Sequence, residues 1–366
     1  MVRVTRLELR DFRNYERAEV ALAPGMTVIC GPNGAGKTNL LEALYFGCTG
    51  RSCRTSNERE LVRFGQKVTR VSVGVAAEDG AHRLDVGFEP GEQKRFRIDD
   101  AQVERPAAAT VRPLIGVFMP DRLDLVKGAP ALRRAHLDQV VAALWPARAA
   151  ARADYSRALA QRNALVARIR AGSARRELLD PWDMELARHG IAVMEARRRA
   201  LERLGQPFAQ LAEELGLPGV CALEYRPRSR TTDAEGLRAE LAERREEDLT
   251  RGFTAHGPHR DDVALTRDRR ALRSYGSQGQ QRAGLLALLF AEREVLADTG
   301  RAPLMLLDDV MSELDAPRRE RLIELVRSGG QAVVTATEAE HVPGARETGV
   351  ELLFVDDGAV ALEAAA

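Results

Sequence analysis

The sequence predicts an α/β fold that contains two kinds of β-sheet and an inserted helical segment. Residues 26–46 show an apolar strand, a glycine-rich loop and a helix in succession, and residues 69–98 contain segments in which apolar and polar side chains alternate. From 131 to 215 the composition changes to Ala, Arg, Leu and Glu, and the α/β pattern resumes near 250. We therefore expect a discontinuous α/β domain over 1–130 and 216–366, with a helical arm over 131–215.

The elements of the first part follow from periodicity. Residues 2–11 alternate loosely and residues 26–30 are uniformly apolar, so both segments are expected to be strands. Residues 39–46 carry leucines at helical spacing. Between 69 and 98, apolar side chains alternate with polar ones around Asp79-Gly80, which predicts antiparallel hairpins.

The inserted segment is expected to be entirely helical. Apolar side chains recur at helical spacing, for example Leu159, Leu165, Val166 and Ile169. Gly172-Ser173 and Asp180-Pro181 interrupt this pattern, which predicts three or four helices.

The last part returns to strands and helices. A buried strand is expected over 303–307, a helix over 318–327 and a second apolar strand over 332–335. The segments 352–355 and 359–362 flank Asp357-Gly358 and predict a closing hairpin, which completes a mixed sheet.

Charge and cysteine content narrow the function classes. The formal net charge is only +1, but residues 133–203 hold 15 Arg against 8 acidic side chains, a local excess of +7. This excess is consistent with a solvated helical face or with a nucleic-acid surface, for which Arg197, Arg198 and Arg199 are the candidates. No apolar run approaches membrane-spanning length, and the four cysteines lack metal-ligand spacing, so we expect a cytoplasmic protein without a membrane partner.

One segment has the spacing of a phosphate-binding loop. Gly31 and Gly36 are separated by four residues, and Lys37 and Thr38 follow at the start of the expected helix. Lys37 is expected to reach the β- and γ-phosphates of a nucleotide, and the Thr38 hydroxyl to bind Mg²⁺. The expected nucleotide-binding residues are Gly31, Pro32, Asn33, Gly34, Ala35, Gly36, Lys37, Thr38 and Asn39.

Two adjacent carboxylates complete this expected site. Asp308 and Asp309 end the apolar strand at 303–307. Asp308 is the candidate Mg²⁺ ligand, and Asp309 the candidate base that orients the attacking water. The alternative interpretation is that the pair caps the next helix.

A second loop of Gly, Ser and Gln precedes an apolar helix at 273–296. Because one nucleotide's phosphates are already held at 31–38, this loop is redundant within one chain. We expect Ser277 and Gly279 to reach the γ-phosphate bound by a second copy, which predicts an ATP-driven dimer with two-fold symmetry. An ordinary loop before a core helix is the alternative.

These motifs together resemble a known family. Ser-Gln-Gly-Gln-Gln at 277–281 is similar to the signature loop of ABC-type ATPases, and residues 312–315 resemble their D-loop. Residues 7–46 are similar to the N-terminal lobe of the SMC, Rad50 and RecN group. The segments DLVKGAPALRRAHLD (124–138), GPHRDD (257–262) and YGSQGQQR (275–282) resemble the RecF family of bacterial recombination mediators.

The resemblance implies a Rad50-like ABC ATPase head, with a mixed P-loop sheet, an antiparallel β subdomain and a short inserted helical arm. It implies ATP with Mg²⁺ as cofactor, weak DNA-stimulated hydrolysis, and an ATP-dependent homodimer that binds double-stranded DNA and single-/double-strand junctions together with RecR and RecO. Arg13 is implied as a nucleotide contact in cis, and Ser277, Gly279 and Gln280 as contacts in trans. Asp121 lies in the region of the Q-loop and is a further candidate metal ligand.

The sequence differs from several related classes of nucleotide-binding protein. Thr335 or Thr337 stands where a transporter ATPase has a switch histidine, and Gly36 and Ser277 are about 240 residues apart, which is too far for that class. A structural SMC head would need long heptad segments. A nuclease relative would need a further acidic domain, and a GTPase would need an Asn-Lys-x-Asp stretch. The segment 257–262 has two open interpretations, a buried ion-pair network or a role near nucleotide or DNA.

Overall fold

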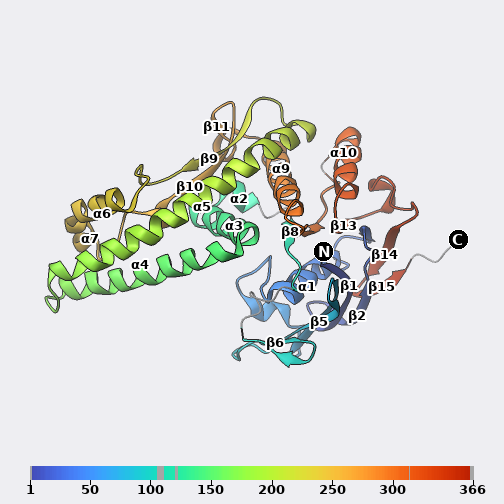
Figure 1. Cartoon of the computed structure of the whole chain (residues 1–366). Coiled ribbons are helices and arrows are strands. Elements are labelled where there is room, and N and C mark those ends of the chain that lie inside the picture. The colour runs from blue at the N-terminus through green and yellow to red at the C-terminus, as the bar shows by residue number, and fades with distance from the viewer. Residues whose placement is uncertain (1, 105–110, 120–122, 313, 363–366) are drawn as a thin grey trace. The chain divides into compact units, whose positions relative to one another are not determined.

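A computed structural model describes residues 2–104, 111–119, 123–312 and 314–362 (Figure 1). The chain divides into two compact units. The first comprises residues 1–122 and 293–366, and the second comprises residues 123–292. No helix within these described ranges is long and apolar enough to cross a membrane.

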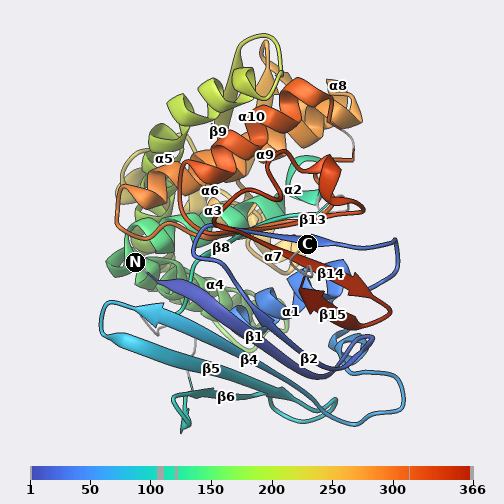
Figure 2. The same cartoon turned by 90° about the vertical axis from the view of Figure 1, so that its right-hand side faces the viewer.

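An antiparallel sheet forms one layer of the first unit (Figure 2). Its strand order is β2-β1-β4-β5-β6-β7. The strands are β1 (Arg3–Phe12), β2 (Tyr15–Ala21), β4 (Thr69–Ala77), β5 (Gly80–Phe88), β6 (Arg95–Ile98) and β7 (Ala101–Gln102). Every second side chain is apolar and buried, as in Leu7, Leu9, Val71 and Val73, which leaves the opposite face to polar residues.

A second, mixed sheet holds the ends of the expected site. Its order is β15-β14-β3-β13-β12-β8, in which β15 pairs antiparallel and the other neighbours pair parallel. The strands are β3 (Met26–Cys30), β8 (Ile115–Phe118), β12 (Leu304–Leu307), β13 (Ala332–Ala336), β14 (Val350–Asp356) and β15 (Ala359–Leu362). Parallel strands place their carboxyl ends at one edge, so the loops after β3, β12 and β13 meet there.

Helices complete the first unit. Helix α1 (Lys37–Thr49) packs against β1, β4 and β5 of the antiparallel sheet and against β13 of the mixed sheet. Its buried side chains Leu40, Leu41 and Leu44 join one apolar core with side chains of both sheets. Helix α10 (Ala316–Arg327) and the 3₁₀ turns Glu58–Leu61 and Ala339–His341 lie in the connections.

The second unit combines helices with a three-stranded antiparallel sheet. The helices are α2 (Asp124–Lys127), α3 (Pro130–Leu144), α4 (Ala149–Arg170), α5 (Leu179–Glu214), α6 (Ala234–Glu243), α7 (Arg245–Arg251) and α8 (Leu272–Tyr275), with 3₁₀ turns at Pro146–Arg148, Arg176–Leu178 and Pro258–Arg260. The strands β9 (Cys221–Arg226), β10 (Asp262–Arg267) and β11 (Arg270–Ala271) pair in the order β11-β10-β9. Helix α9 (Gln278–Ala297) begins in this unit, and its last residues belong to the first.

A buried ion cluster joins three helices of this unit. Arg162 on α4 donates to Asp183 on α5 over 2.6 Å and to Asp248 on α7 over 2.6 Å, and all three side chains are fully buried. The Thr254 hydroxyl accepts a further hydrogen bond from Arg162. The cluster therefore fixes how α4, α5 and α7 pack.

Two expectations about the helical segment change. Asp180-Pro181 does not break a helix, since both residues lie in the first turn of the 36-residue α5, where proline is tolerated because its missing N–H has no partner there. The compact units also divide the chain at positions other than 130 and 215. Helix α5 packs against β9 and α6, and residues 216–292 belong to the same compact unit as the helices, whereas residues 293–366 belong to the first unit. The head and arm division at 1–130, 131–215 and 216–366 stays a prediction about function.

Candidate functional site

The glycine-rich loop after β3 is tightly folded. Gly31 has a φ of 153°, and a Cβ there would lie 2.1 Å from the carbonyl oxygen of Val355. Gly36 has a φ of 120°, and a Cβ there would lie 2.7 Å from the Tyr15 hydroxyl. No described side chain caps the first turn of α1, which starts directly after Gly36. Its first main-chain N–H groups therefore keep their capacity for an anion.

The turn between β1 and β2 supports the loop from one side. Asn14 Nδ2 donates to the carbonyl of Ala35 over 3.0 Å, and the Tyr15 hydroxyl donates to the carbonyl of Gly36 over 3.0 Å. Asn39 Nδ2 donates in turn to Asn14 Oδ1 over 2.8 Å. These bonds hold the loop in the conformation that its glycines permit.

Lys37 lies inside the loop. Its Nζ donates to the carbonyl oxygens of Gly31 (2.6 Å) and Pro32 (3.0 Å), and the side chain is buried. Burial lowers the pKa of Lys37, while the nearby carboxylates of Asp309 and Asp308 oppose this change. The ammonium group is thus held at the centre of the loop and close to both acidic residues.

Asp308 is bound by two threonine hydroxyls. Thr38 Oγ1 lies 3.0 and 2.9 Å from the two carboxylate oxygens, and Thr335 Oγ1 donates to Oδ1 over 2.8 Å. The main-chain N–H of Asp308 donates to the carbonyl of Phe118 on β8. Burial raises the pKa of Asp308, and the hydrogen bonds from Thr335 and Thr38 counteract this rise. The sequence-predicted pair of Thr38 and Asp308, 270 residues apart, is therefore in direct contact.

Asp309 adopts an uncommon backbone conformation beside this pair. Its φ is 43°, in the left-handed region that Asp tolerates better than most residues. Its main-chain N–H donates to Thr335 Oγ1 over 2.9 Å, and its carbonyl accepts a hydrogen bond from Ser312. The Asp309 carboxylate does not cap α10, because Asp315 has that role and accepts the N–H of Arg318.

The donors near Asp308 suit a hard divalent cation. One hydroxyl, one carboxylate and the oxygens of a nucleotide phosphate are the ligands that Mg²⁺ takes in such loops, with water completing the shell. The described residues contain no cluster of three or more His, Cys, Asp or Glu that could hold a metal alone. Thr38 and Asp308 therefore fit an Mg²⁺ that arrives with its nucleotide.

Arg13 is paired with a buried acid on α1. Its guanidinium donates to Glu42 over 2.8 and 2.9 Å, and Glu42 is fully buried. Arg54 also contacts Glu42 at 3.4 Å and donates to Asn39 Oδ1 over 2.8 Å. Arg54 lies near enough to Asp308 to oppose the rise in the pKa of that carboxyl. Glu42 therefore pairs with Arg13, which the sequence analysis names as a nucleotide contact, and with Arg54, which it does not name.

The Ser277 loop belongs to the second unit and forms a reciprocal cap on α9. The main-chain N–H of Ser277 donates to Gln280 Oε1 over 3.0 Å, and the N–H of Gln280 donates to Ser277 Oγ over 3.3 Å. This S-x-x-Q arrangement is a capping box. Gln281 is buried and donates to the carbonyls of Leu272 and Gly276, which anchors the loop, while Ser277 and Gly279 remain exposed.

The segment 257–262 lies within a hydrogen-bonded network of the second unit. The Tyr155 hydroxyl and His259 Nδ1 are 2.6 Å apart, and His259 Nε2 lies 2.9 Å from the Thr254 carbonyl. Asp261 accepts hydrogen bonds from Tyr225 and from the main chain of Arg228. Of the two interpretations left open by the sequence, the buried network is the one that these contacts support.

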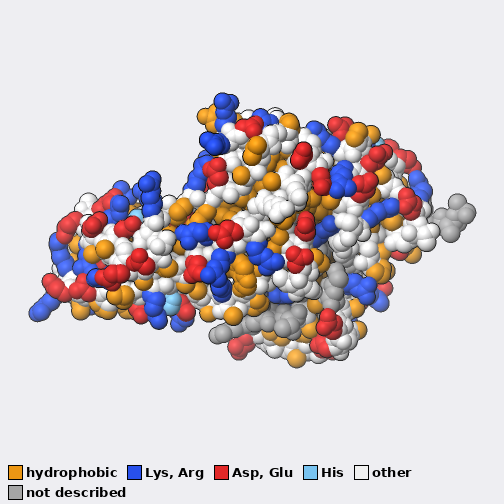
Figure 3. Space-filling model, turned by 45° about the horizontal axis from the view of Figure 1, so that its top comes forward, with side chains coloured by type: hydrophobic (Ala, Val, Ile, Leu, Met, Phe, Trp, Pro, Cys, Tyr) orange, Lys and Arg blue, Asp and Glu red, His pale blue; other side chains and the backbone are white. Residues whose placement is uncertain are grey.

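The three arm arginines proposed for DNA differ in exposure. Arg197 is buried, donates to Asp138 over 2.8 and 3.0 Å, and donates to the Pro258 carbonyl over 2.7 Å. The prediction that Arg197 contacts DNA is therefore wrong for this structure, because its guanidinium is buried and bonded to Asp138 and Pro258. Arg199 is exposed and pairs with Glu195, and Arg198 is half-buried, so both stay candidates. On the face that Figure 3 shows, acidic and basic side chains are intermixed.

Asp121, proposed for the Q-loop region, and Glu313, in the expected D-loop, lie outside the described residues.

Several site residues were not predicted. The sequence gives Thr335 no role beyond standing where a transporter ATPase has a switch histidine, and it assigns no role to Asn14, Tyr15, Glu42 or Arg54. For Asn14 and Tyr15 the available signal was their closeness to Arg13 in the sequence, and for Glu42 it was its place on the helix that follows the glycine-rich loop. What the sequence does not reveal is that β13 lies beside both β3 and β12, which brings Thr335 to Asp308.

Comparisons with known proteins agree with this geometry. The family model described as the RecF/RecN/SMC N-terminal domain matches residues 3–360. A DNA replication and repair protein RecF from Streptomyces avermitilis is 40% identical, with 93% of this chain and 95% of that protein covered. The corresponding protein of Acidothermus cellulolyticus is 39% identical over 92% of this chain and 94% of its own length.

Solved structures give the same grouping. The structure of the recombination mediator protein RecF with ATP in the RecFOR pathway has a TM-score of 0.86 at 27% identity, covering 99% of this chain and 98% of that one. The SMC head domain of Pyrococcus furiosus bound to ScpA has a TM-score of 0.60 at 17% identity, with 98% and 95% covered, which is a likeness of fold alone. The expected ABC-type α/β head fold is therefore confirmed.

Proposed function

The chain belongs to the RecF family, and on this premise we propose that it is an ATP-dependent DNA-binding protein of recombinational repair. The observation that carries the proposal is the contact among Thr38, Asp308 and Thr335, beside Lys37 and Asp309. Such a set can bind a nucleoside triphosphate with Mg²⁺ and position water for its hydrolysis.

Nucleotide binding would use the loop and the first turn of α1. The main-chain N–H groups of residues 34–39 would face the phosphates, and Lys37 would exchange a carbonyl partner for a phosphate oxygen. Mg²⁺, when bound, would neutralise phosphate charge and would be held by Thr38 and Asp308. Its charge would also favour ionised Asp308, which burial alone disfavours.

Hydrolysis would depend on Asp309. Asp309 has a left-handed backbone, Asp315 and not Asp309 caps α10, and the Thr335 hydroxyl accepts the main-chain N–H of Asp309. The carboxylate would orient the attacking water and accept its proton. Turnover would be weak and stimulated by DNA, because hydrolysis acts here as a switch between two states.

Dimerisation would complete the site. Ser277, Gly279 and Gln280 would contact the γ-phosphate held by a second copy, since a helix N-terminus of this composition favours anions. To do so, Ser277 and Gln280 would exchange their mutual capping bonds for bonds to phosphate. A shared γ-phosphate would favour the dimer with ATP and release it with ADP.

The biological setting follows from the relatives. Proteins named for DNA replication and repair and for the RecFOR pathway support a role at single-strand gaps, where the dimer would bind duplex DNA and single-/double-strand junctions and help RecO and RecR to load recombinase. Such a protein would work in the cytoplasm. Arg13, Arg198 and Arg199 remain proposed contacts, Arg13 to nucleotide and the other two to DNA.

The trans arrangement has a direct test. We expect Ser277→Arg to leave the dissociation constant for ATP unchanged and to abolish the ATP-dependent dimer in sedimentation velocity, because a bulky cation would occupy the interface. Ser274→Arg, at an exposed position of the same segment that precedes the capping box, is the matched control. ATP-dependent dimers of normal stability from Ser277→Arg would refute the assignment in trans.

A further inference from the structure

The outward face of the antiparallel sheet carries four arginines in register. Arg17 on β2 lies opposite Arg10 on β1, and Arg10 lies opposite Arg70 on β4. Arg70 then pairs with Gly87 on β5, which lies opposite Arg95 on β6. We call Arg17, Arg10, Arg70 and Arg95 the arginine row. It crosses five strands, with one glycine as its only gap.

The charges of the arginine row are not compensated within the described residues. Arg17, Arg70 and Arg95 are exposed and form no ion pair or side-chain hydrogen bond there, and the Nε of Arg10 approaches only Asp11, at 3.8 Å. Like charges placed directly opposite on neighbouring strands destabilise a sheet. The arginine row therefore places mutually repelling charges on an exposed face, where they are expected to destabilise the sheet.

The adjacent row on the same face is different. Its acidic side chains Glu8, Glu19 and Asp85 pair with Arg6 and Arg83, for example Arg6 with Glu8 at 3.0 Å and Arg83 with Asp85 at 3.1 Å. The two rows thus differ in whether their charge is satisfied inside the sheet.

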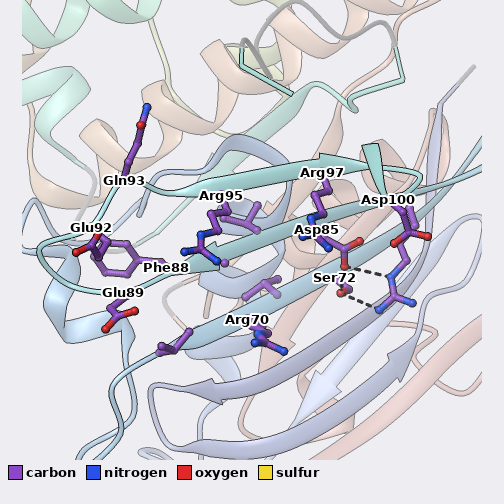
Figure 4. A pocket seen from close by; sticks show the side chains of 15 residues that line it. Arg70, Ser72, Asp85, Phe88, Glu89, Glu92, Gln93, Arg95, Arg97 and Asp100 are labelled. Atoms are coloured by element: carbon purple, nitrogen blue, oxygen red, sulfur yellow. Dashed lines mark hydrogen bonds and ion pairs between the residues drawn. The ribbon is translucent and has the colours of Figure 1, made fainter. Parts of the chain in front are cut away.

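The arginine row also lines two hollows of the first unit. Arg10, Arg17 and Arg70 line a hollow of about 670 Å³. Arg70 and Arg95 line a neighbouring hollow of about 510 Å³, in which Glu89 and Glu92 lie at the turn that follows β5 (Figure 4). Figure 4 shows Arg70, Arg95 and Arg97 projecting from their strands around this second hollow.

We propose that the arginine row is a binding surface for the phosphate backbone of duplex DNA. This inference rests on the proposed DNA-binding function and adds a location for it, on the sheet and not on the helical arm. Four strand spacings make the row roughly 19 Å long, which equals the length of helix axis over which one strand of duplex DNA carries five to six phosphates. Each guanidinium would donate to phosphate oxygens and release a condensed counterion, without reading the base sequence.

The composition of the face favours this occupant over two others. The outward positions of β1, β2, β4, β5 and β6 carry no aromatic and no large aliphatic side chain among the described residues. Single-stranded DNA is usually bound by aromatic stacking, and protein partners usually need an apolar centre. A duplex backbone needs neither.

The test measures the salt dependence of DNA binding by the full-length protein. Fluorescence anisotropy with a labelled duplex of arbitrary sequence and ATP would be recorded between about 50 and 200 mM KCl, the range where phosphate contacts dominate. The triple variant Arg17→Gln, Arg70→Gln, Arg95→Gln should reduce the slope of log affinity against log salt concentration by about 2.7. Raising the salt over this range should therefore weaken its binding by a factor about 40 times smaller than for the wild type. The matched control removes three exposed arginines elsewhere in the first unit, Arg59→Gln, Arg327→Gln and Arg346→Gln, and should keep the wild-type slope.

The possible results distinguish failure of the proposed arginine row from failure of the proposed DNA-binding function. Wild-type binding with an unchanged slope in the triple variant would overturn the row and leave DNA binding in place. Equal losses in the triple variant and the control would also overturn it, since the effect would then follow net charge. A wild-type protein that binds no duplex in any nucleotide state would overturn both proposals. The single variants Arg17→Gln and Arg95→Gln, at opposite ends, should each lower the slope by about 0.9, which tests the row independently of how the triple variant folds.

Discussion

The hydroxyl of Thr335 donates a hydrogen bond to Asp308 Oδ1 over 2.8 Å, from the strand next to the one that Asp308 ends. Thr335 Oγ1 also accepts a hydrogen bond from the main-chain N–H of Asp309 over 2.9 Å. One side chain thus orients the proposed metal ligand and fixes the backbone of the proposed catalytic residue. Threonine at this position links the two roles that the nucleotide site requires.

We predict that Thr335→Val lowers ATP turnover by about tenfold to a hundredfold, a common effect of removing a group that orients a metal ligand. Valine keeps the shape but removes the hydroxyl, so both hydrogen bonds are lost. Steady-state phosphate release measures the effect, and Thr335→Ser, which keeps the hydroxyl, should retain most activity. Equal turnover in wild type and Thr335→Val would show that the bridge has no role in catalysis.

Lys37→Met should weaken ATP binding by roughly 10- to 100-fold, because a hydrogen bond to a charged group contributes about 1.5–3 kcal/mol. Titration of a fluorescent ATP analogue gives the dissociation constant. Lys67→Met removes an exposed lysine of the same unit and is the matched control. A dissociation constant for Lys37→Met equal to that of Lys67→Met would place the phosphates elsewhere.

The ion cluster of the second unit should dominate its stability. Arg162→Ala leaves the fully buried carboxylates of Asp183 and Asp248 without their shared partner, and we expect a loss of about 3–5 kcal/mol in the free energy of unfolding. Urea unfolding measures it. Arg157→Ala, which removes an exposed partner of Asp154, should change the free energy by less than about 1 kcal/mol. Similar losses for both variants would contradict the structural role of the cluster.

His259 should make the second unit sensitive to acid. Burial lowers the pKa of His259 to about 4 from 6.5, and the Thr254 carbonyl at Nε2 opposes this only in part. Since Thr254 can only accept, Nε2 carries the proton and Nδ1 accepts from Tyr155. The folded state therefore binds a proton less readily than the unfolded state, so stability is fully present above pH 6.5 and is lost as pH falls towards 4.

This pH effect is on the order of 3 kcal/mol, because the pKa of His259 is about 4 in the folded state and 6.5 when the residue is exposed. Urea midpoints measured between pH 7 and 4 should fall less steeply for His259→Gln than for wild type. His341→Gln, on an exposed turn of the first unit, should keep the wild-type slope. A His259→Gln variant with the wild-type pH dependence would assign the acid sensitivity to other groups.

The parts of the site that depend on local sequence were predictable. Glycine spacing, Lys37 and the strand that ends in Asp308 each follow from a short segment, and the contact between Thr38 and Asp308 follows once both segments belong to one parallel sheet. Strand order is a long-range property, which is why Thr335 received no role from its sequence alone. The pairing of Arg13 with Glu42 has the same cause, because it joins the turn between β1 and β2 to a helix face that periodicity does not assign to a partner.

The inserted segment was the less predictable part. Arg197 belongs to a run of three arginines that looks solvent-exposed by composition, yet the amphipathic face of α5 turns it inward to Asp138. Its neighbours on the helix, 100° apart by geometry, remain accessible. Charge content therefore indicates a surface only after the buried face of a helix is known.

The central claim is that two copies share each bound ATP across their interface, and that the dimer formed in this way binds DNA. Sedimentation velocity of Asp309→Asn with a labelled gapped duplex, without nucleotide, with ADP and with ATP, tests it most directly, because this variant should bind ATP without cleaving it. We predict that a dimer carrying DNA forms with ATP and does not form with ADP or without nucleotide. A protein that stays monomeric in all three conditions, or a dimer with ATP that leaves the DNA free, would contradict the account.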